Sequence, residues 1–179
     1  IFDLVHYSRK YLSAAKPLEM KAISTGVGKL QNLDAADLKL LKLTAKNARV
    51  PVVELAGRLG MTPSAVIYRL KRLEKGGVIL AYKAIIDFSR LGYEYYKVDV
   101  ELEDLNVKNK MSGFLRLHPN VTYEDRTIGG SDLEFDVEVP NYETFLQIIE
   151  ELKAAFPNSI RRYTFYKSRK VLKTLYFPE

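Results

Sequence analysis

The sequence of 179 residues contains no cysteine and no tryptophan, and only two histidines. Without cysteine there can be no disulfide, no thiolate nucleophile and no cysteine-ligated zinc. His6 and His118 lie far apart in the sequence without metal-ligand spacing, so we predict neither a metal site nor a cofactor. No apolar run approaches the roughly 18 residues that span a bilayer, and the first ten residues lack the apolar core of a secretory signal. A reducing cytoplasm is the natural setting, although a chain without cysteine suits any compartment.

Charge is distributed unevenly along the chain, which has a formal net charge of +6. Residues 33–88 carry a net charge of +5, whereas residues 89–159 carry −7. Apolar residues make up 47% of the chain and charged residues 28%, which is typical of a globular protein. A basic segment followed by an acidic one indicates two modules, of which the first is suited to a polyanion such as nucleic acid.

The segment that begins at residue 33 has the pattern of three short helices. Asp34 is a plausible N-cap for the first helix, and the second helix begins at Pro51, which suits a first helical turn. Gly60 can adopt the left-handed conformation that ends a helix. Thr62 and Pro63 then give the third helix an N-cap followed by a proline at the first helical position.

A basic third helix after a short turn, followed by a wing, is the design of a winged helix-turn-helix domain, which we predict for residues 33–88. The runs Val78–Leu80 and Ala84–Phe88 can pair as the wing. In this design the N-terminal part of the third helix contacts base edges in the major groove of DNA. An exposed arginine is more often merely solvated, and Tyr68 could instead pack under the wing. The candidates for base edges or phosphates are Thr62, Ser64, Ala65, Tyr68, Arg69 and Arg72, and those for phosphates alone are Lys71, Lys75 and Arg49.

Residues 89–179 predict a second module with the element order strand, helix, strand, strand, helix, strand. Apolar and charged residues alternate over 96–103 and over 133–139, as they do in half-buried strands. This order is the split βαβ arrangement of a ferredoxin-like domain, so the chain is predicted to be α+β. Both helices cover one face of such a sheet, and two copies can cover the other face by pairing back to back. We therefore expect a homodimer or a higher homo-oligomer. The other expected ranges are strands over 121–128 and 160–172, and helices over 107–117 and from 141 to about 156.

Several motifs from Leu33 to the end of the chain resemble the Lrp/AsnC family of transcription regulators. The resemblance covers about four-fifths of the chain, and its combination of motifs is specific although each is weak alone. It implies a winged helix-turn-helix domain, a ferredoxin-like dimerisation domain, assemblies of dimers on double-stranded DNA, and in many members regulation by an amino acid or similar small metabolite. The motifs are Leu33-Asp34 with Asp37 and Leu41, Asn47-Ala48-Arg49, Leu55-Ala56 with Leu59-Gly60-Met61-Thr62-Pro63-Ser64, Arg69-x-x-Arg72-Leu73-Glu74, Gly77-Val78-Ile79, His118-Pro119-Asn120-Val121 and Gly129-Gly130-Ser131-Asp132-Leu133.

The resemblance also implies an effector site at the turn between the second and third strands of the dimerisation domain. The matching residues are Gly129, Gly130, Ser131 and Asp132. Glycine amides can receive a carboxylate, and Asp132 can receive an ammonium group. The same four residues also suit a plain hairpin turn. Ser131 stands where many family members have an aromatic residue, so this turn departs from the family pattern.

A second departure from the family is the 32 residues that precede the predicted DNA-binding domain. Ser8-Arg9-Lys10-Tyr11-Leu12 recurs as Ser168-Arg169-Lys170-Val171-Leu172, 160 positions later. We therefore interpret residues 1–12 as the last strand of a preceding sheet domain, in a chain that is the C-terminal part of a longer tandem protein. A basic arm or a strand added to the sheet edge is the alternative. Residues 13–32 are rich in Ser, Ala, Gly and Lys and are predicted to be a linker.

Two further patterns invite an enzymatic interpretation. Glu134, Asp136, Glu138, Glu101 and Glu103 form an acidic stripe, which more often pairs with a basic strand such as the one carrying Arg161, Arg162, Lys167 and Arg169. Sirohaem decarboxylases resemble the same family and share its two-domain layout. Their tetrapyrrole chemistry needs histidines and basic residues, and the two histidines here are poorly placed for it. We therefore expect a regulator and not an enzyme.

Overall fold

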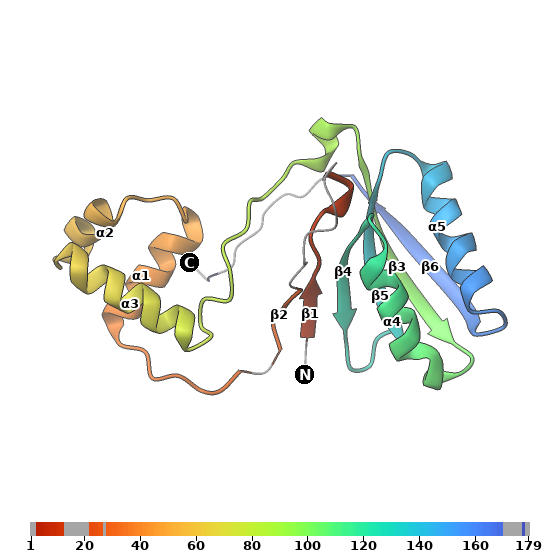
Figure 1. The fold of residues 1–179 in the computed structure, drawn as a ribbon, viewed down its shortest axis with the longest axis horizontal. Coiled ribbons are helices and arrows are strands. Elements are labelled where there is room, and N and C mark those ends of the chain that lie inside the picture. The colour runs from red at the N-terminus through yellow and green to blue at the C-terminus, as the bar shows by residue number, and fades with distance from the viewer. Residues whose placement is uncertain (1–2, 13–21, 27, 170–176, 178–179) are drawn as a thin grey trace. The chain divides into compact units, whose positions relative to one another are not determined.

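The computed structural model describes residues 3–12, 22–26, 28–169 and 177, and the chain divides into two compact units. We call residues 28–84 together with Phe177 the helical unit, and the N-terminal segment together with residues 85–169 the sheet unit. Figure 1 shows the ribbon of each unit. The boundary after Ala84 lies slightly before the predicted one, and the α+β class with its two modules is confirmed.

The helical unit contains α1 (Ala35–Lys46), α2 (Val52–Leu59) and α3 (Pro63–Lys75). Asp34 caps α1 by accepting a hydrogen bond from the Asp37 amide, and the Asp37 side chain accepts one from the Asp34 amide in return. Such reciprocal capping satisfies two amides that the helix itself leaves without partners. Pro51 occupies the N-cap of α2, one position before the first turn where the sequence placed it. The buried core consists of Leu40, Leu41, Leu55, Ala56, Val66 and Leu73, and Phe177 packs against it.

The predicted wing strands do not form, which corrects that part of the sequence analysis. Neither Val78–Leu80 nor Ala84–Phe88 belongs to a strand in the described part of the chain. The amides of Val78 and Ile79 instead donate to the Leu73 carbonyl, at 2.9 and 3.2 Å, so this segment closes the C-terminal end of α3. Its β-branched side chains pack on the helical core, and local capping thus replaces strand pairing.

The sheet unit is built on a six-stranded sheet in which every neighbouring pair is antiparallel. The strand order is β2-β1-β4-β5-β3-β6. The last four strands in that order have the ferredoxin-like arrangement predicted from the sequence, and β1 and β2 extend the sheet beyond β4. The strands are β1 (Asp3–His6), β2 (Ile23–Ser24), β3 (Glu94–Leu102), β4 (Val121–Arg126), β5 (Leu133–Val139) and β6 (Ile160–Ser168). The helices are α4 (Lys108–Leu117) and α5 (Tyr142–Ala155), with 3-10 turns η1 (Lys10–Leu12), η2 (Phe88–Leu91) and η3 (Leu105–Val107).

The helices α4 and α5 pack on one face of this sheet, as Figure 1 shows. Every second side chain of β3 and β5 points into that core because successive residues of a strand face opposite sides. Asn141 caps α5 by accepting a hydrogen bond from the Thr144 amide at 2.8 Å. The opposite face of the sheet carries the charged alternate residues, including the predicted acidic stripe. Members of the core are Val98, Val100, Leu133, Phe135, Val137, Met111, Leu115, Phe145, Ile148 and Leu152.

The acidic stripe has several partners. On β6, Arg162 pairs with Glu101 and Arg161 with Glu103, as the sequence predicted. On the inner strands, Lys97 contacts Glu134 at 3.1 Å, and Tyr95 donates to Asp136. Arg9 pairs with Glu138, so the basic last strand is only one of three sources of donors.

The N-terminal segment forms β1, which pairs with β4 and so extends the four-stranded ferredoxin-like sheet; this agrees with the alternative that a strand is added at that sheet's edge. The predicted linker over 13–32 is wrong at Ile23–Ser24, because these residues pair with β1 as β2. The tandem origin of residues 1–12 stays a prediction. The predicted last strand extends to Leu172, whereas β6 ends at Ser168 and residues 170–172 lie outside the described residues. Among the helices described, none has the length and apolar character needed to cross a membrane.

Candidate DNA-binding surface

The turn between α2 and α3 fixes how α3 emerges from the helical unit. Gly60 has a φ of 64°, in the left-handed region where a side chain is strained. The Met61 amide donates to the Ala56 carbonyl at 2.9 Å, which closes α2. Thr62 then accepts a hydrogen bond from the Ala65 amide at 3.2 Å, and Pro63 starts α3. The sequence predicted this turn with its caps, and the structure confirms it.

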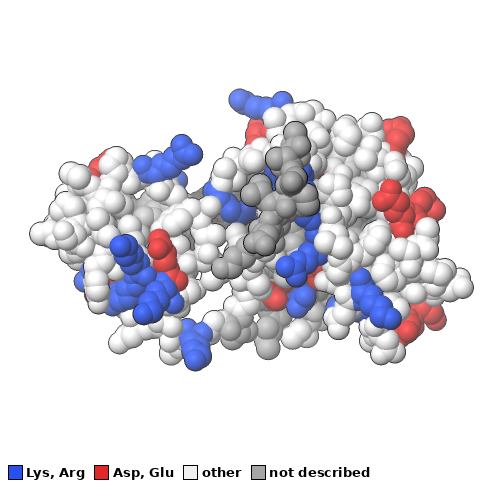
Figure 2. All heavy atoms as spheres, viewed as in Figure 1, with Lys and Arg blue, Asp and Glu red and all other residues white. Residues whose placement is uncertain are grey.

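One side of α3 is buried and the opposite side is exposed. Val66 and Leu73 are inaccessible to solvent or nearly so, and they anchor the helix to α1 and α2. Tyr68 is 69% exposed. Figure 2 shows lysine and arginine side chains gathered over the helical unit, with acidic side chains beside them. The exposed predicted residues are Thr62, Ser64, Tyr68, Lys71, Arg72 and Lys75 on or next to α3, and Arg49 before α2, whereas Ala65 is half-buried.

Arg69 and Arg72 differ from the other predicted DNA-binding residues because both pair with carboxylates of α1. Arg69 Nη1 lies 2.7 Å from Asp34 Oδ2 and 2.7 Å from Asp37 Oδ1. Arg72 donates to the other oxygen of Asp37. The Asp37 side chain is inaccessible to solvent, so it serves as a buried anchor for both arginines. We call Asp34, Asp37, Arg69 and Arg72 the carboxylate clamp.

The electrostatics of the clamp follow from this geometry. Burial favours the neutral acid and would raise the pKa of Asp37, but the hydrogen bonds from Arg69 and Arg72 outweigh it and lower that pKa. The hydrogen bond from Arg69 likewise lowers the pKa of Asp34. Both carboxylates are therefore ionised at neutral pH and hold α3 against the start of α1.

Sequence reasoning missed the clamp, although its spacing was visible. Residues three apart on a helix share a face, so Asp34 and Asp37 lie together on α1, and Arg69 and Arg72 lie together on α3. Two pairs of opposite charge with matched spacing, on two short helices of one unit, indicate a contact between those helices. From the sequence, both arginines are predicted to contact DNA, and Asp37 is named only as part of a family motif.

The predicted effector residues form a tight hairpin turn with internal partners. Gly129 has a φ of 80°, and a Cβ at Gly130 would collide with Thr127 and Glu134. The Ser131 amide donates to Glu134 Oε1 at 3.2 Å. Asp132 Oδ2 accepts a hydrogen bond from the Leu102 amide at 2.8 Å. These contacts account for both glycines and for Asp132 as parts of the turn.

The two histidines lie apart in the sheet unit and hold structural positions. His6 is buried on β1, where its ring meets that of Tyr123 at 4.7 Å. His118 Nδ1 accepts a hydrogen bond from the Asn120 amide at 3.1 Å, and burial lowers its pKa. In the described residues no three His, Asp or Glu side chains are grouped to hold a metal ion.

A helix-turn-helix unit with an exposed basic helix, joined to a ferredoxin-like sheet unit, defines a class of DNA-binding regulators. Residues 33–79 match a winged helix-turn-helix DNA-binding family model. The chain is 30% identical over 129 residues to the proline dehydrogenase transcriptional activator of Rhodobacter capsulatus, covering 70% of this chain and 84% of that protein. It is 25% identical over 140 residues to the regulatory protein AsnC of Haemophilus influenzae, covering 66% of this chain and 93% of that protein.

The fold of the chain is also similar to that of a solved regulator structure. The structure of a Neisseria meningitidis transcriptional regulator in complex with L-methionine superposes with a TM-score of 0.73 at 20% identity, covering 83% of this chain and 97% of that one. The chain belongs to the Lrp/AsnC family and is a DNA-binding transcription regulator. The relatives are named as regulators, which favours this function over the sirohaem decarboxylase alternative.

Proposed function

We propose that the exposed side of α3 recognises duplex DNA, with Ser64 and Tyr68 directed to base edges or phosphates and Lys71 and Lys75 to phosphates. The observation that carries this proposal is the polarity of α3: Val66 and Leu73 are buried, whereas these four side chains are exposed. Side chains on the first turns of such a helix reach base edges, and lysines toward its end reach the backbone. Arg49, exposed just before α2, is a further phosphate contact.

The clamp divides the two predicted arginines from this set. Arg69 is 22% exposed and holds two carboxylates, so we propose that it positions α3 without contacting bases. The Arg72 side chain is 44% exposed and bonds Asp37 through one nitrogen, which leaves other guanidinium donors for a phosphate. Thr62 caps the helix, and half-buried Ala65 offers at most an apolar contact.

A salt titration tests the phosphate contacts. Each lysine on a phosphate releases counterions, so Lys71→Ala with Lys75→Ala should lower the slope of log affinity against log salt by about 2. Fluorescence anisotropy with DNA selected from a random pool gives that slope. Lys108→Ala with Lys110→Ala on α4 removes the same charge from the sheet unit and is the matched control. An equal change in slope with both double variants would contradict the proposal.

A second measurement separates base contacts from backbone contacts. Tyr68→Phe with Ser64→Ala should weaken binding to the selected sequence by roughly tenfold or more, as the loss of base readout does. Binding to an unrelated duplex of the same length should stay nearly unchanged. Loss of equal size on both duplexes would reassign these side chains to phosphates.

We further propose that the regulator binds as a homodimer or an assembly of dimers. The charged sheet face opposite α4 and α5 is the surface through which copies pair, since both helices cover the other face. Two α3 helices related by a twofold axis would read half-sites about one helical turn apart, or a multiple of it. Footprinting of the selected DNA should then show two protected half-sites at that spacing.

An amino-acid effector is a second candidate activity, motivated by the L-methionine in the Neisseria regulator. Gly129, Gly130, Ser131 and Asp132 would form part of that site. Because Asp132 already accepts the Leu102 amide, we expect Asp132→Asn to weaken effector binding only if the effector displaces this bond. Thermal-shift assays with each amino acid, followed by calorimetry, test for binding.

Absorbance titration with a tetrapyrrole tests the proposal that the chain is not an enzyme, and we expect no spectral change.

A further inference from the structure

The N-terminal edge segment, residues 3–12, pairs with β4 through β1 (Asp3–His6) and continues past it into the turn η1 (Lys10–Leu12). β1 runs antiparallel to β4, with Val5 opposite Glu124 and His6 opposite Tyr123. Val5 and Tyr7 are buried in the core of the sheet unit, at 7% and 6% exposure. Covering a sheet edge in this way satisfies its free amides and carbonyls.

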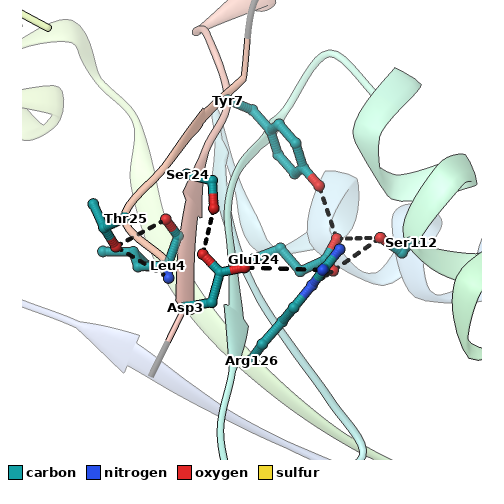
Figure 3. Close-up of polar contacts among 8 residues, drawn as sticks. All are labelled: Asp3, Leu4, Tyr7, Ser24, Thr25, Ser112, Glu124 and Arg126. Carbon is teal, nitrogen blue, oxygen red and sulfur yellow. Dashed lines mark hydrogen bonds and ion pairs between the residues drawn. The ribbon is translucent and has the colours of Figure 1, made fainter. Parts of the chain in front are cut away.

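The same segment supplies partners to two buried carboxylates. Tyr7 Oη donates to Glu124 Oε2 at 2.8 Å, and Ser112 of α4 also donates to this carboxylate, at 2.7 Å (Figure 3). Arg9 makes a bidentate contact with Glu138, with both nitrogen–oxygen distances at 2.7 Å, and Tyr11 donates to the same carboxylate. The Glu138 side chain is inaccessible to solvent. The N-terminal edge segment therefore supplies matched hydrogen-bond donors to both buried carboxylates, in addition to its backbone pairing with β4.

The structure strengthens the internal repeat found in the sequence. At the offset of 160 positions, β1 aligns with residues 163–166, which lie inside β6. The two strands also agree in side-chain direction. Val5 enters the helix-covered core, and its counterpart Phe165 meets the ring of Phe145 on α5 at 4.8 Å. A chance similarity between two short sequences would not be expected to preserve both the strand conformation and the sheet face to which each side chain points.

Hydrogen-bond donors are preserved at the two positions that bind the carboxylates. Tyr7 aligns with Lys167, and Arg9 aligns with Arg169. Lys167 lies over the ring of Tyr96, on the helix-covered side like Tyr7, and its ion pair with Glu94 is half-exposed and therefore weak. β6 is the outermost strand at its end of the sheet order, so its second edge has no strand beside it in the described residues.

We propose that the β4 edge is a docking site for β6 of another copy, which the N-terminal edge segment occupies and blocks in this chain. Lys167 then faces Glu124, Arg169 faces Glu138, and helices of both copies lie on one side of a continuous sheet. The contact joins two different edges and is therefore heterologous, unlike pairing through the sheet face. In this chain the N-terminal edge segment fills the β4 edge and prevents that pairing.

A labelled peptide of residues 160–172 tests this proposal by fluorescence anisotropy. The chain lacking residues 1–12, with its fold checked by circular dichroism, should bind the peptide saturably, whereas the full chain should not. A peptide with Lys167→Ala and Arg169→Ala should bind at least about tenfold more weakly. A peptide with Arg161→Ala and Arg162→Ala loses the same charge outside the aligned contacts, and should keep its affinity.

Three outcomes would overturn the proposal. These are no binding by the folded shortened chain, equal weakening by the two double-substituted peptides, and unchanged affinity in a shortened chain carrying Glu138→Gln. If the shortened chain does not fold, Val5→Asp in the full chain carries the test, because a charge at this buried position dislodges β1. Failure of that variant to bind the peptide would equally overturn the proposal. DNA binding is read separately, so neither result bears on the α3 surface.

Discussion

Asp37 combines two tasks that sequence patterns usually assign to different residues. It completes the cap of α1 through the Asp34 amide, and it receives Arg69 and Arg72 from α3. A buried carboxylate is tolerated only when such partners replace the water it has lost. The position of α3 is thus tied to the first turn of α1 through one side chain.

Replacing Asp37 by Asn should destabilise the helical unit by about 2–3 kcal/mol. The amide keeps the size of the side chain but removes the charge that Arg69 and Arg72 require. Urea unfolding at pH 7 measures the effect. Arg58→Ala breaks an exposed pair with Glu54 and should cost less than about 0.5 kcal/mol. Similar losses for the two variants would show that the clamp contributes no more than a surface pair.

The pH dependence of this effect has a definite sign. The pKa of Asp37 in the folded protein lies below its ordinary value of 3.8. The ionised carboxylate therefore contributes stability that is fully present above about pH 4 and is lost as the pH falls through the folded pKa. The difference between wild type and Asp37→Asn should shrink in that acidic range.

Asp136 on β5 should behave in the opposite way. Burial raises its pKa to about 6, with the charges of Asp125 and Asp99 adding to the shift, although Tyr95 and Lys97 oppose it. The folded state then favours the neutral acid, so ionisation costs stability as the pH rises from about 4 to 6. Asp136→Asn should raise the free energy of unfolding at pH 7.5 by on the order of 3 kcal/mol. The gain should fall at pH 4.5, and an equal effect at both pH values would contradict this assignment.

At the scale of elements, the turn between α2 and α3 depends on the backbone of Gly60. A Cβ there would meet no atom within 4 Å, so the cost of Gly60→Ala arises from its φ of 64° alone. We expect a loss of about 1 kcal/mol in thermal unfolding. Gly57→Ala, inside α2 and equally free of neighbours, is the control and should stabilise by up to about 0.8 kcal/mol. Loss of stability in both variants would indicate packing and not backbone strain.

Local signals predicted most of these elements. Thr62 and Pro63 marked the start of α3, and alternation marked β3 and β5, because capping and burial act over a few residues. The prediction of wing strands was wrong because the amides of Val78 and Ile79, two residues with strand propensity, donate to the Leu73 carbonyl instead of to a neighbouring strand. The carboxylate partners of Arg69 are not visible to such local signals, because they lie 35 and 32 positions away in the sequence. Such contacts depend on how helices pack, which no window of sequence contains.

At the scale of the whole molecule, the two units have separate cores. One core joins α1, α2 and α3 through residues such as Leu40 and Leu55. The other joins the sheet to α4 and α5 through residues such as Phe135 and Phe145. A domain with its own core can unfold on its own, so the chain is expected to lose structure in two steps.

Calorimetry should resolve these two steps, and the residue-scale variants identify them. Asp37→Asn should lower only the transition of the helical unit, whereas Asp136→Asn at pH 7.5 should raise only that of the sheet unit. Hydrogen exchange of the Leu40 and Phe135 amides gives an independent reading of the two free energies. If either variant moved both transitions equally, the units would unfold as one, and DNA bound at α3 would then stabilise the sheet unit as much as the helical unit. If the two transitions are independent, DNA added to the wild type should raise the unfolding temperature of the helical unit alone, unless the sheet units pair on the DNA.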